Sequence, residues 1–256
     1  MQKSSTGVAY NSVPENLEPI EHGEKFSFSC HPGIVCFGEC CRKLRLMLTP
    51  YDVVKLREKL ELSSKNFIER YTTMEFRPPS YAPVLFLKMA ENGEQTCPFL
   101  SETGCSVYSH RPSACRIYPV ARATRFHGVH GILMESFFLV KEAHCRGFEE
   151  ATQWTVEEWL GDQGLTEYHR LNDEWTRILM HPRLKQGLSA HQQELFYMAT
   201  YELDVFRRLV SSPKFRAAFD AEEVLEGDDI ALLEFGLKWL AFSLLGETTG
   251  VSKKEL

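Results

Sequence analysis

The stretch SCHPGIVCFGECCRKLRLMLTP spans residues 29–50 and contains four cysteines, Cys30, Cys36, Cys40 and Cys41. Thiolate sulfur is a soft donor that selects zinc, copper(I) or iron–sulfur clusters over magnesium or calcium. Glycines in the same stretch let the backbone wrap close to an ion. The density of thiols therefore predicts a metal centre that organises this part of the fold.

Four further cysteines follow, and the last 111 residues contain none. These are Cys97, Cys105, Cys115 and Cys145. The two sets are too far apart in sequence to share a loop, so the fold must bring them together. All eight are predicted metal ligands. Eight thiols suit two four-thiolate sites, but a single such site with spare cysteines fits the number equally well.

The adjacent pair Cys40 and Cys41 limits how the thiols can be assigned to metal ions. On an extended chain consecutive side chains point in opposite directions, so both can reach one tetrahedral ion only with strain. We expect either that one of them is not a ligand or that the two serve different metals. A thiol redox relay is the other use of such a pair, because basic neighbours lower thiol pKa values.

The composition is that of a globular protein, with 256 residues, 43% of them hydrophobic and 25% charged. The net charge is −6, but residues 1–148 carry 18 basic and 15 acidic side chains. This excess is too small for nucleic-acid binding, and no such partner is expected. Compensation of thiolate charge is the more fitting use of these basic residues.

The N-terminus has no apolar run of the kind that a signal peptide requires, so a cytoplasmic location is expected. No stretch approaches the roughly 20 apolar residues of a membrane span, and no membrane association is expected. Disulfides are rare in a reducing compartment, which again favours metal ligation by the cysteines.

We predict an α+β fold in three parts. Residues 1–25 are polar and are expected to form a flexible or surface-draped leader. Residues 26–148 should form a cysteine-cluster metal-binding domain of short strands and helices. Residues 149–256 should form an α-helical region packed on that domain.

Local patterns predict several of the elements. Thr49-Pro50-Tyr51-Asp52 is a helix start with a threonine cap and an acidic residue at the third helical position. Strands are predicted at 84–89 and 131–140. Apolar residues at helical spacing run from Leu195 to Val210, and a last helix is predicted from Asp229 to Leu245, ending at Gly246.

Several motifs occur in order along the chain: C-x3-C-C-R, LTPYDVVKLREKLELSSKNFIERY, CPFL, GCSVYSHRPSACRIYP and HCRG. Over residues 26–148 they resemble the YkgJ or CxxCxxCC family, whose proteins are described as zinc- or iron-chelating. The resemblance implies a metal-binding domain. The chain departs from the family in its first interval, which has five residues between Cys30 and Cys36 instead of the usual two.

A more distant similarity is to flagellin lysine N-methylase, which implies an iron–sulfur cluster and S-adenosylmethionine. The sequence has no glycine-rich nucleotide loop of the G-x-G-x-x-G type, no P-loop and no H-E-x-x-H motif. Catalytic residues are therefore not identified, and the sequence does not decide whether the protein is an enzyme.

The spacing of the cysteines favours an iron–sulfur cluster, of the 4Fe–4S type, over zinc. Structural zinc sites usually show two short C-x2-4-C pairs, and only Cys36 with Cys40 fits. The net negative charge of a cluster could be offset by Arg42, Arg111 and Arg116, which are predicted to contact the cofactor. Alternative nitrogen ligands are His31, His110 and His144.

The predicted function is a metal-binding protein that supports protein-modification or redox chemistry. One alternative is a non-catalytic interaction module with structural zinc, and another is a lysine methylase that uses S-adenosylmethionine. A protein substrate or partner is expected, while the oligomeric state is not indicated.

Overall fold

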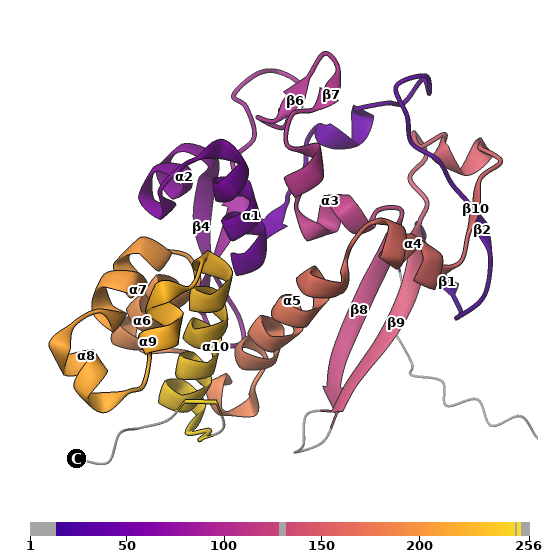
Figure 1. Cartoon of the computed structure of the whole chain (residues 1–256). Helices are drawn as coiled ribbons and strands as arrows, with labels where there is room; N and C mark the ends of the chain where they lie inside the picture. Colours follow the sequence, from indigo (N-terminus) through magenta and orange to yellow (C-terminus); the bar gives the residue numbers. More distant parts are fainter. Residues whose placement is uncertain (1–13, 128–131, 249, 252–256) are drawn as a thin grey trace, which may run out of the picture.

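The computed structural model describes residues 14–127, 132–248 and 250–251 (Figure 1). Small antiparallel sheets and the loops around them occupy the upper and right-hand parts of Figure 1, and a group of helices fills the lower left. Helices and short antiparallel strands are thus combined in one chain, and the predicted α+β class is confirmed.

One part of the molecule is a three-stranded antiparallel sheet with two helices. Its elements are β3 (Met47–Leu48), α1 (Pro50–Leu60), α2 (Ser64–Tyr71), β4 (Thr72–Arg77) and β5 (Ala82–Leu87). Strand β5 lies between β3 and β4, and each of its residues is buried. The predicted start of α1 is confirmed, because Thr49 and Asp52 each accept the other's backbone N–H with the side chain.

A second three-stranded antiparallel sheet has the order β1-β9-β8. Its strands are β1 (Leu17–Ile20), β8 (Val120–His127) and β9 (Ile132–Val140). Strand β9 confirms the strand predicted at 131–140. Strand β1 lies inside the segment expected to be a leader, and Leu17 pairs with Val140. Local sequence does not reveal a pairing between residues so far apart.

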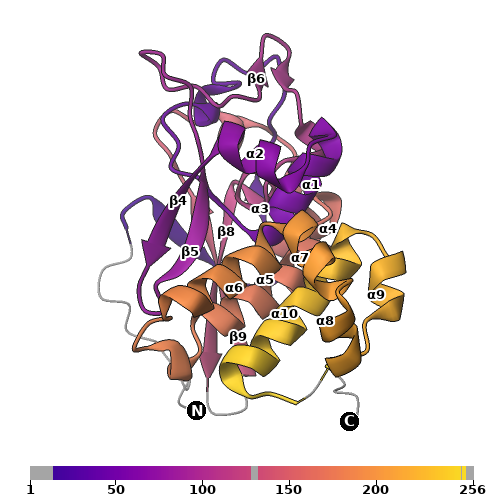
Figure 2. The same cartoon turned by 90° about the vertical axis from the view of Figure 1, so that its left-hand side faces the viewer.

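The remaining short elements surround the cysteine-bearing loops. They are β2 (Phe26–Ser27), β6 (Leu100–Ser101), β7 (Gly104–Cys105), α3 (Ser113–Ile117) and β10 (Gln153–Trp154). Strand β2 pairs with β10, and β6 pairs with β7. Figure 2 shows β6 at the top of the molecule.

The second half of the chain is mainly helical. Its helices are α4 (Val156–Asp162), α5 (Thr166–Leu179), α6 (Ala190–Thr200), α7 (Leu203–Val210), α8 (Pro213–Ala218), α9 (Glu222–Glu226) and α10 (Asp229–Leu245). Helix α10 has the predicted bounds and ends at Gly246, which has a φ of +68°. At Gly236 an added Cβ would lie 2.5 Å from the Ala199 carbonyl oxygen, so glycine lets α10 pack closely against α6.

The apolar stripe from Leu195 to Val210, expected to lie on one helix, is divided between α6 and α7. Tyr201 ends α6 with a φ of −121°. Its fully buried hydroxyl donates to the Leu48 carbonyl at 3.1 Å. A tertiary hydrogen bond to β3 therefore accompanies the break, and helical spacing alone does not reveal it.

The two halves share their hydrophobic cores. The larger core joins β5 and α1 to α5, α6, α7 and α10. The smaller core combines Phe28, Val120 and Phe137 with Val156 and Trp159. Both cores contain residues from before and after residue 149, so the helical region is packed directly on the cysteine-bearing half.

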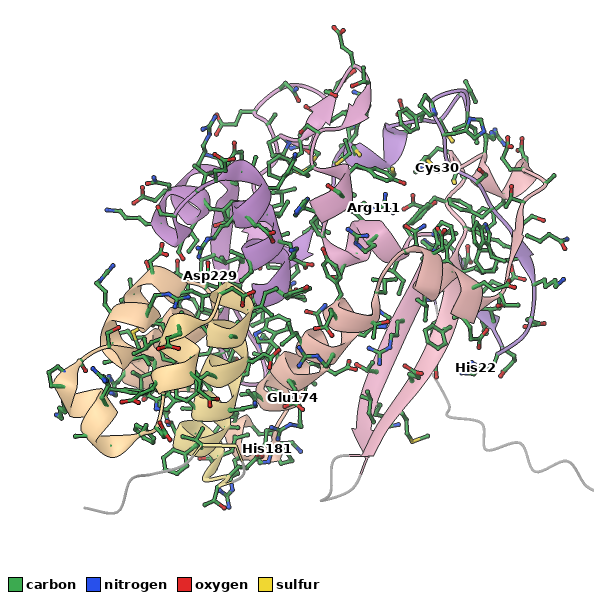
Figure 3. The ribbon with its side chains drawn as sticks, viewed as in Figure 1. His22, Cys30, Arg111, Glu174, His181 and Asp229 are labelled. Atoms are coloured by element: carbon green, nitrogen blue, oxygen red, sulfur yellow. The ribbon has the colours of Figure 1, made fainter. Side chains whose placement is uncertain are left out.

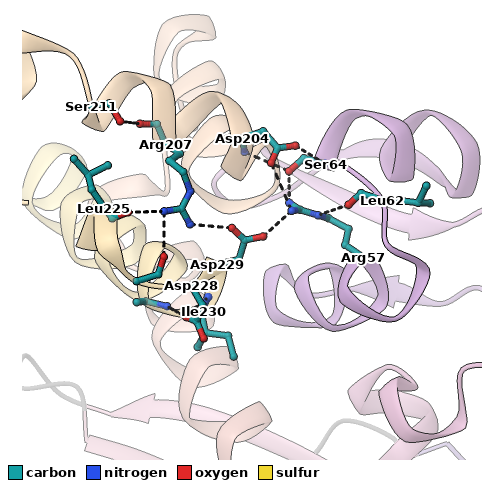
Figure 4. Close-up of polar contacts among 12 residues, drawn as sticks. Arg57, Leu62, Ser64, Asp204, Arg207, Ser211, Leu225, Asp228, Asp229 and Ile230 are labelled. Atoms are coloured by element: carbon teal, nitrogen blue, oxygen red, sulfur yellow. Dashed lines mark hydrogen bonds and ion pairs between the residues drawn. The ribbon is translucent and has the colours of Figure 1, made fainter. Parts of the chain in front are cut away.

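An ion network around the buried Arg57 also connects the halves (Figure 4). Arg57 on α1 is only 7% exposed and donates to the Asp229 carboxylate on α10 at 2.6 Å. Arg207 on α7 donates to the other oxygen of that carboxylate at 3.1 Å. Asp204 accepts the N–H of Ser64 at 2.6 Å, which attaches α7 to α2.

Replacing Asp229 with alanine should lower the free energy of unfolding by about 2 kcal/mol, because the buried Arg57 guanidinium then loses its nearest carboxylate. Asp204 stays 3.6 Å from Arg57 and limits the loss. Urea denaturation measures the change. Glu223→Ala, which removes an exposed carboxylate from the neighbouring α9, should change stability far less. Equal effects of the two substitutions would contradict the role given to the network.

Candidate metal centre

The loop that carries the first four cysteines folds through tight turns. Gly38 has a φ of +84°, in the left-handed region that glycine adopts without strain. Glu39–Cys41 then form a 3-10 helix, and the Gly38 carbonyl accepts the Cys41 N–H at 3.0 Å. The glycine thus turns the chain so that two adjacent cysteines lie on one short helical turn.

Cys40 and Cys41 are therefore not on extended backbone, which was the basis for expecting opposed side chains. Successive side chains on a 3-10 helix are roughly 120° apart, and the two thiols hydrogen-bond to each other. This bond lowers the pKa of Cys40 to about 7 and raises the pKa of Cys41. The pair lies side by side instead of facing apart.

The segment that leads into the β6–β7 hairpin adds two thiols to the same region. The N–H of Cys97 donates to the Cys41 carbonyl at 2.8 Å. Cys105 is the last residue of β7. The residue before Cys105 is Gly104, where an added Cβ would lie 2.9 Å from the ring of Phe37. The absence of a side chain at Gly104 therefore lets the hairpin lie against the loop that carries the first four cysteines.

Helix α3 carries Cys115 and is held by Asp52, a fully buried residue of α1. The Asp52 carboxylate accepts the Ser113 N–H at 2.7 Å and the Ser113 hydroxyl at 3.2 Å. It also accepts the Thr49 N–H at 2.9 Å. Burial raises the pKa of this carboxyl group, while the hydrogen bonds oppose the rise. The sequence indicated only the role of Asp52 in its own helix.

The last cysteine approaches the first loop from the other side. The backbone N–H of Arg146, next to Cys145, lies 3.2 Å from the Cys36 sulfur and donates to it. The Ser29 N–H donates to the Gly147 carbonyl at 3.1 Å. These contacts place the two ends of the predicted metal-binding domain beside each other.

Electrostatic interactions divide the thiols into two groups. Burial is the main cause that raises the pKa of Cys30 to about 11, and electrostatic repulsion from Cys40, Cys36 and Cys145 raises it further. Burial is also the main cause that raises the pKa of Cys115 to about 12, and electrostatic repulsion from Cys97 is the next largest cause. The first group is Cys30, Cys36 and Cys145, and the second group is Cys41, Cys97, Cys105 and Cys115. Cys40 interacts with members of both groups.

All eight cysteines are free thiols. Cys30 and Cys40 are exposed residues, but their thiol groups are partly shielded from solvent. Within the described part of the chain, no three cysteine, histidine, aspartate or glutamate side chains are arranged to hold a metal ion. Figure 3 shows Cys30 and Arg111 together in the upper part of the molecule, away from His181. The fold brings the thiol-bearing segments together, and the set of metal ligands stays a prediction.

The three arginines predicted to contact a cofactor lie in this region. Arg42, Arg111 and Arg116 each have a buried Nε atom without a hydrogen-bond partner. Arg111 interacts electrostatically with Cys30, Cys40 and Cys105, and its charge favours their thiolate forms. Buried donors without a partner are uncommon in folded proteins, so the Arg111 Nε atom is suited to an anionic group beside the thiols. The Arg42 Nε atom, in contrast, lies 3.5 Å from the Glu39 carboxylate.

Gln163, just after α4, connects two of these arginines to the helical half. Its carbonyl accepts from Arg116 at 2.8 Å, and its side chain accepts from Arg111. Arg116 also donates to the Ser109 carbonyl at 2.6 Å. Gln163 is buried, and nothing in the sequence singled it out. Arg42 instead pairs with surface carboxylates, including Glu94.

The three histidines considered as nitrogen ligands have other partners. His31 Nδ1 accepts the Gly33 N–H at 3.2 Å. His110 Nδ1 lies 2.8 Å from the Ser109 hydroxyl, and His144 Nε2 lies 3.3 Å from the Glu142 carboxylate. Their present contacts therefore give no support to a role as ligands.

Comparison with known proteins identifies the cysteine-bearing part. Residues 29–151 match the model of the CxxCxxCC family, which is described as a "Putative zinc- or iron-chelating domain". The resemblance to this family is confirmed. No curated protein and no solved structure matches the chain, and the similarity to flagellin lysine N-methylase stays a prediction. Among the described helices, none has the length and apolar character to cross a membrane.

Proposed function

The chain carries a CxxCxxCC domain at residues 29–151, and we propose that its eight cysteines hold a metal centre. The preferred cofactor is an iron–sulfur cluster of the 4Fe–4S type, and zinc is the alternative. The observation that carries the proposal is the gathering of free thiols from separate segments around Arg111, whose buried Nε atom has no hydrogen-bond partner. Soft sulfur donors beside fixed positive charge suit an anionic metal–thiolate centre.

Two centres are proposed, because the thiols form two groups and Cys40 interacts with both. One centre would take Cys41, Cys97, Cys105 and Cys115 as its four ligands. The other group becomes complete when Cys40 joins Cys30, Cys36 and Cys145. The adjacent cysteines would then serve different metals, which is one of the two uses expected from their sequence.

Iron–sulfur clusters are preferred over zinc because of the long sequence intervals and because of Arg111. Its side chain interacts with thiols of both groups, and a guanidinium can donate hydrogen bonds to the sulfur atoms of a cluster. A bound cluster supplies one-electron redox chemistry. The residues of the chain would bind the cluster, offset its charge and shield it from water.

Metal analysis combined with an absorption spectrum tests the proposal on protein that is purified without oxygen. Iron with matching sulfide and a broad visible absorption band supports the cluster. Colourless protein with stoichiometric zinc supports the alternative. Protein that contains neither iron nor zinc, even after reconstitution with each, would refute a metal centre of either kind.

Binding of zinc or iron to the apo protein should release protons and should tighten as the pH rises from 6 to 8. The pKa of Cys30 is raised to about 11 and that of Cys115 to about 12, so both are protonated thiols at neutral pH. Metal ligation requires their thiolate forms. Calorimetry in buffers of different ionisation enthalpy measures the protons released. Metal affinity that does not depend on pH would contradict thiol ligation.

Structural zinc in a non-catalytic interaction module is the alternative function. It is favoured by the direct links from Arg111 and Arg116 to Gln163, through which the cysteine-bearing region supports the helical half. Zinc with four protein ligands and no open position would support it. Lysine methylation is tested separately, by calorimetric titration of the metal-loaded protein with S-adenosylmethionine.

A further inference from the structure

Strand β4 is an edge strand of its sheet. The strand order is β3-β5-β4, so in the described part of the chain β4 pairs with β5 alone (Figure 2). The main-chain groups on the outer side of an edge strand can accept a further strand, and proteins usually protect them for this reason. The metal proposal assigns no role to this edge.

The hydrogen-bond pattern decides which groups of β4 point outward. The Lys88 N–H donates to the Tyr71 carbonyl at 2.7 Å, just before β4 begins. Hydrogen-bonded pairs alternate along an antiparallel ladder, so every second residue from Tyr71 onward directs its N–H and C=O groups to β5. Met74 and Phe76 lie between these residues and direct theirs outward. Among the residues that the structure describes, these outward groups have no hydrogen-bond partner.

The same two residues present apolar side chains that the fold leaves uncovered. Met74 and Phe76 are each 48% exposed, although they lie opposite Leu85 and Pro83 of the buried strand β5. Tyr81, just past the turn between β4 and β5, is 51% exposed. Large apolar side chains beside unpaired main-chain groups favour the addition of a strand. The outer side of β4 is therefore a candidate protein interface.

The charged side chains of β4 lie on the opposite face of the sheet from Met74 and Phe76. One Arg45 nitrogen donates to both Glu75 carboxylate oxygens, at 2.7 and 2.9 Å. Arg77 lies 3.5 Å from the same carboxylate, and its side chain is 47% exposed. A partner strand must therefore match a carboxylate and a guanidinium that are two residues apart on one face.

We propose that the partner is a second copy of this chain, paired through β4 around a two-fold axis at Phe76. In a two-fold interface, if one residue opposes another, the reverse contact also forms. With Phe76 opposite its own copy, Glu75 opposes Arg77 of the second copy, and Arg77 opposes Glu75 of the second copy. The Phe76 N–H and C=O groups then form the central pair of hydrogen bonds.

The neighbouring registers fit less well. Opposed residues of an antiparallel pair lie on the same face, so the two-fold axis moves by whole residues along β4. An axis at Glu75 places two carboxylates directly opposite each other, which is destabilising. An axis at Met74 pairs Phe76 with Thr72, whose N–H already donates to the Ile68 carbonyl of α2. Charge and free donors thus both select the axis at Phe76.

The pairing joins two three-stranded sheets into one sheet of six strands. Strand β4 has six residues, so the interface is short and lies at the low end of the size range for specific contacts. We expect a dissociation constant on the order of 10 µM. The pairing uses no cysteine, so it does not depend on the proposed metal centre.

Sedimentation velocity of the full-length protein, from about 1 to 300 µM, measures the dimer across its expected dissociation constant. A reductant is present, because all eight cysteines are free thiols. Glu75→Lys and Arg77→Glu each place like charges opposite each other twice in the dimer. Each variant alone should dimerise about tenfold more weakly. Glu223→Lys, at an exposed position on α9, should dimerise like the wild type.

A mixture of the two charge variants gives the sharpest comparison. In a mixed dimer the two substituted positions oppose each other with opposite charges, and so do the two native positions. The mixture should therefore regain the wild-type affinity to within about threefold, whereas a folding defect in either variant would not be repaired by mixing.

Phe76→Pro tests the main-chain pairing itself. The substitution removes the central outward N–H, which β5 does not use, and an edge strand tolerates proline at such a position. Dimerisation should weaken at least about tenfold, while circular dichroism stays that of the wild type. The proposal is overturned if the wild type stays monomeric at all concentrations, if the charge variants dimerise like the wild type, or if their mixture does not recover.

Discussion

Removing the metal from the loaded protein should unfold residues 29–45 and 96–118 locally and leave α10 folded. Between residues 29 and 45 only Ile34 is a buried hydrophobic residue, and between 96 and 118 only Phe99 and Val107 are. Segments with so few buried apolar contacts gain little stability from packing. Metal–thiolate bonds are expected to supply the missing stability.

Hydrogen exchange read out by mass spectrometry measures this effect segment by segment. Amides of the two segments should exchange about a thousandfold faster after chelation, which corresponds to about 4 kcal/mol. Amides of α10 provide the internal control, because nine of its residues are buried and eight of these belong to the larger core. Equal acceleration in all segments, or none in either, would contradict a metal that holds these loops.

Replacement of Asp52 with alanine should lower the free energy of unfolding by about 3–4 kcal/mol. The substitution leaves the N–H groups of Thr49 and Ser113 without acceptors and opens a space at a fully buried position. The effect should also reach the metal centre, because α3 begins at Ser113 and carries Cys115.

Asp52→Asn keeps the size of the side chain and one acceptor oxygen, so its loss of stability should be smaller. Asp220→Ala removes an exposed carboxylate and should have little effect. Urea denaturation gives the stabilities, and the metal bound per protein gives the second comparison. An Asp52→Ala protein that is as stable as Asp220→Ala would show that this carboxylate does not hold α1 and α3 together.

Elements with strong local signals were predicted correctly. The bounds of α10 follow from its apolar run and from Gly246, and the start of α1 follows from the Thr49–Asp52 capping box. The break at Tyr201 and the strand β1 depend on contacts with residues far away in the sequence. No local pattern reports such contacts, which is why these two features were not predicted.

The candidate site, too, could be predicted only where the signal lies in the local sequence. Clustered cysteines indicated the part of the chain that matches the CxxCxxCC family, since thiol density is a property of the sequence itself, while the metal ligands and the role of the arginines stay predictions. The contact of Cys40 with Cys41 depends on the 3-10 turn after Gly38, and sequence spacing did not indicate this turn. Gln163 contributes through its backbone carbonyl and a buried amide, and neither has a recognisable sequence signal.

Residue-resolved alkylation is the most direct test that thiols from distant segments converge on metal. Metal-loaded protein is treated with iodoacetamide before and after chelation, and each cysteine is quantified by mass spectrometry. The account predicts that all eight thiols are protected in the loaded protein and become reactive together once the metal is removed. Free alkylation of Cys97, Cys115 or Cys145 in protein of proven metal content, or cystines in place of free thiols, would contradict it.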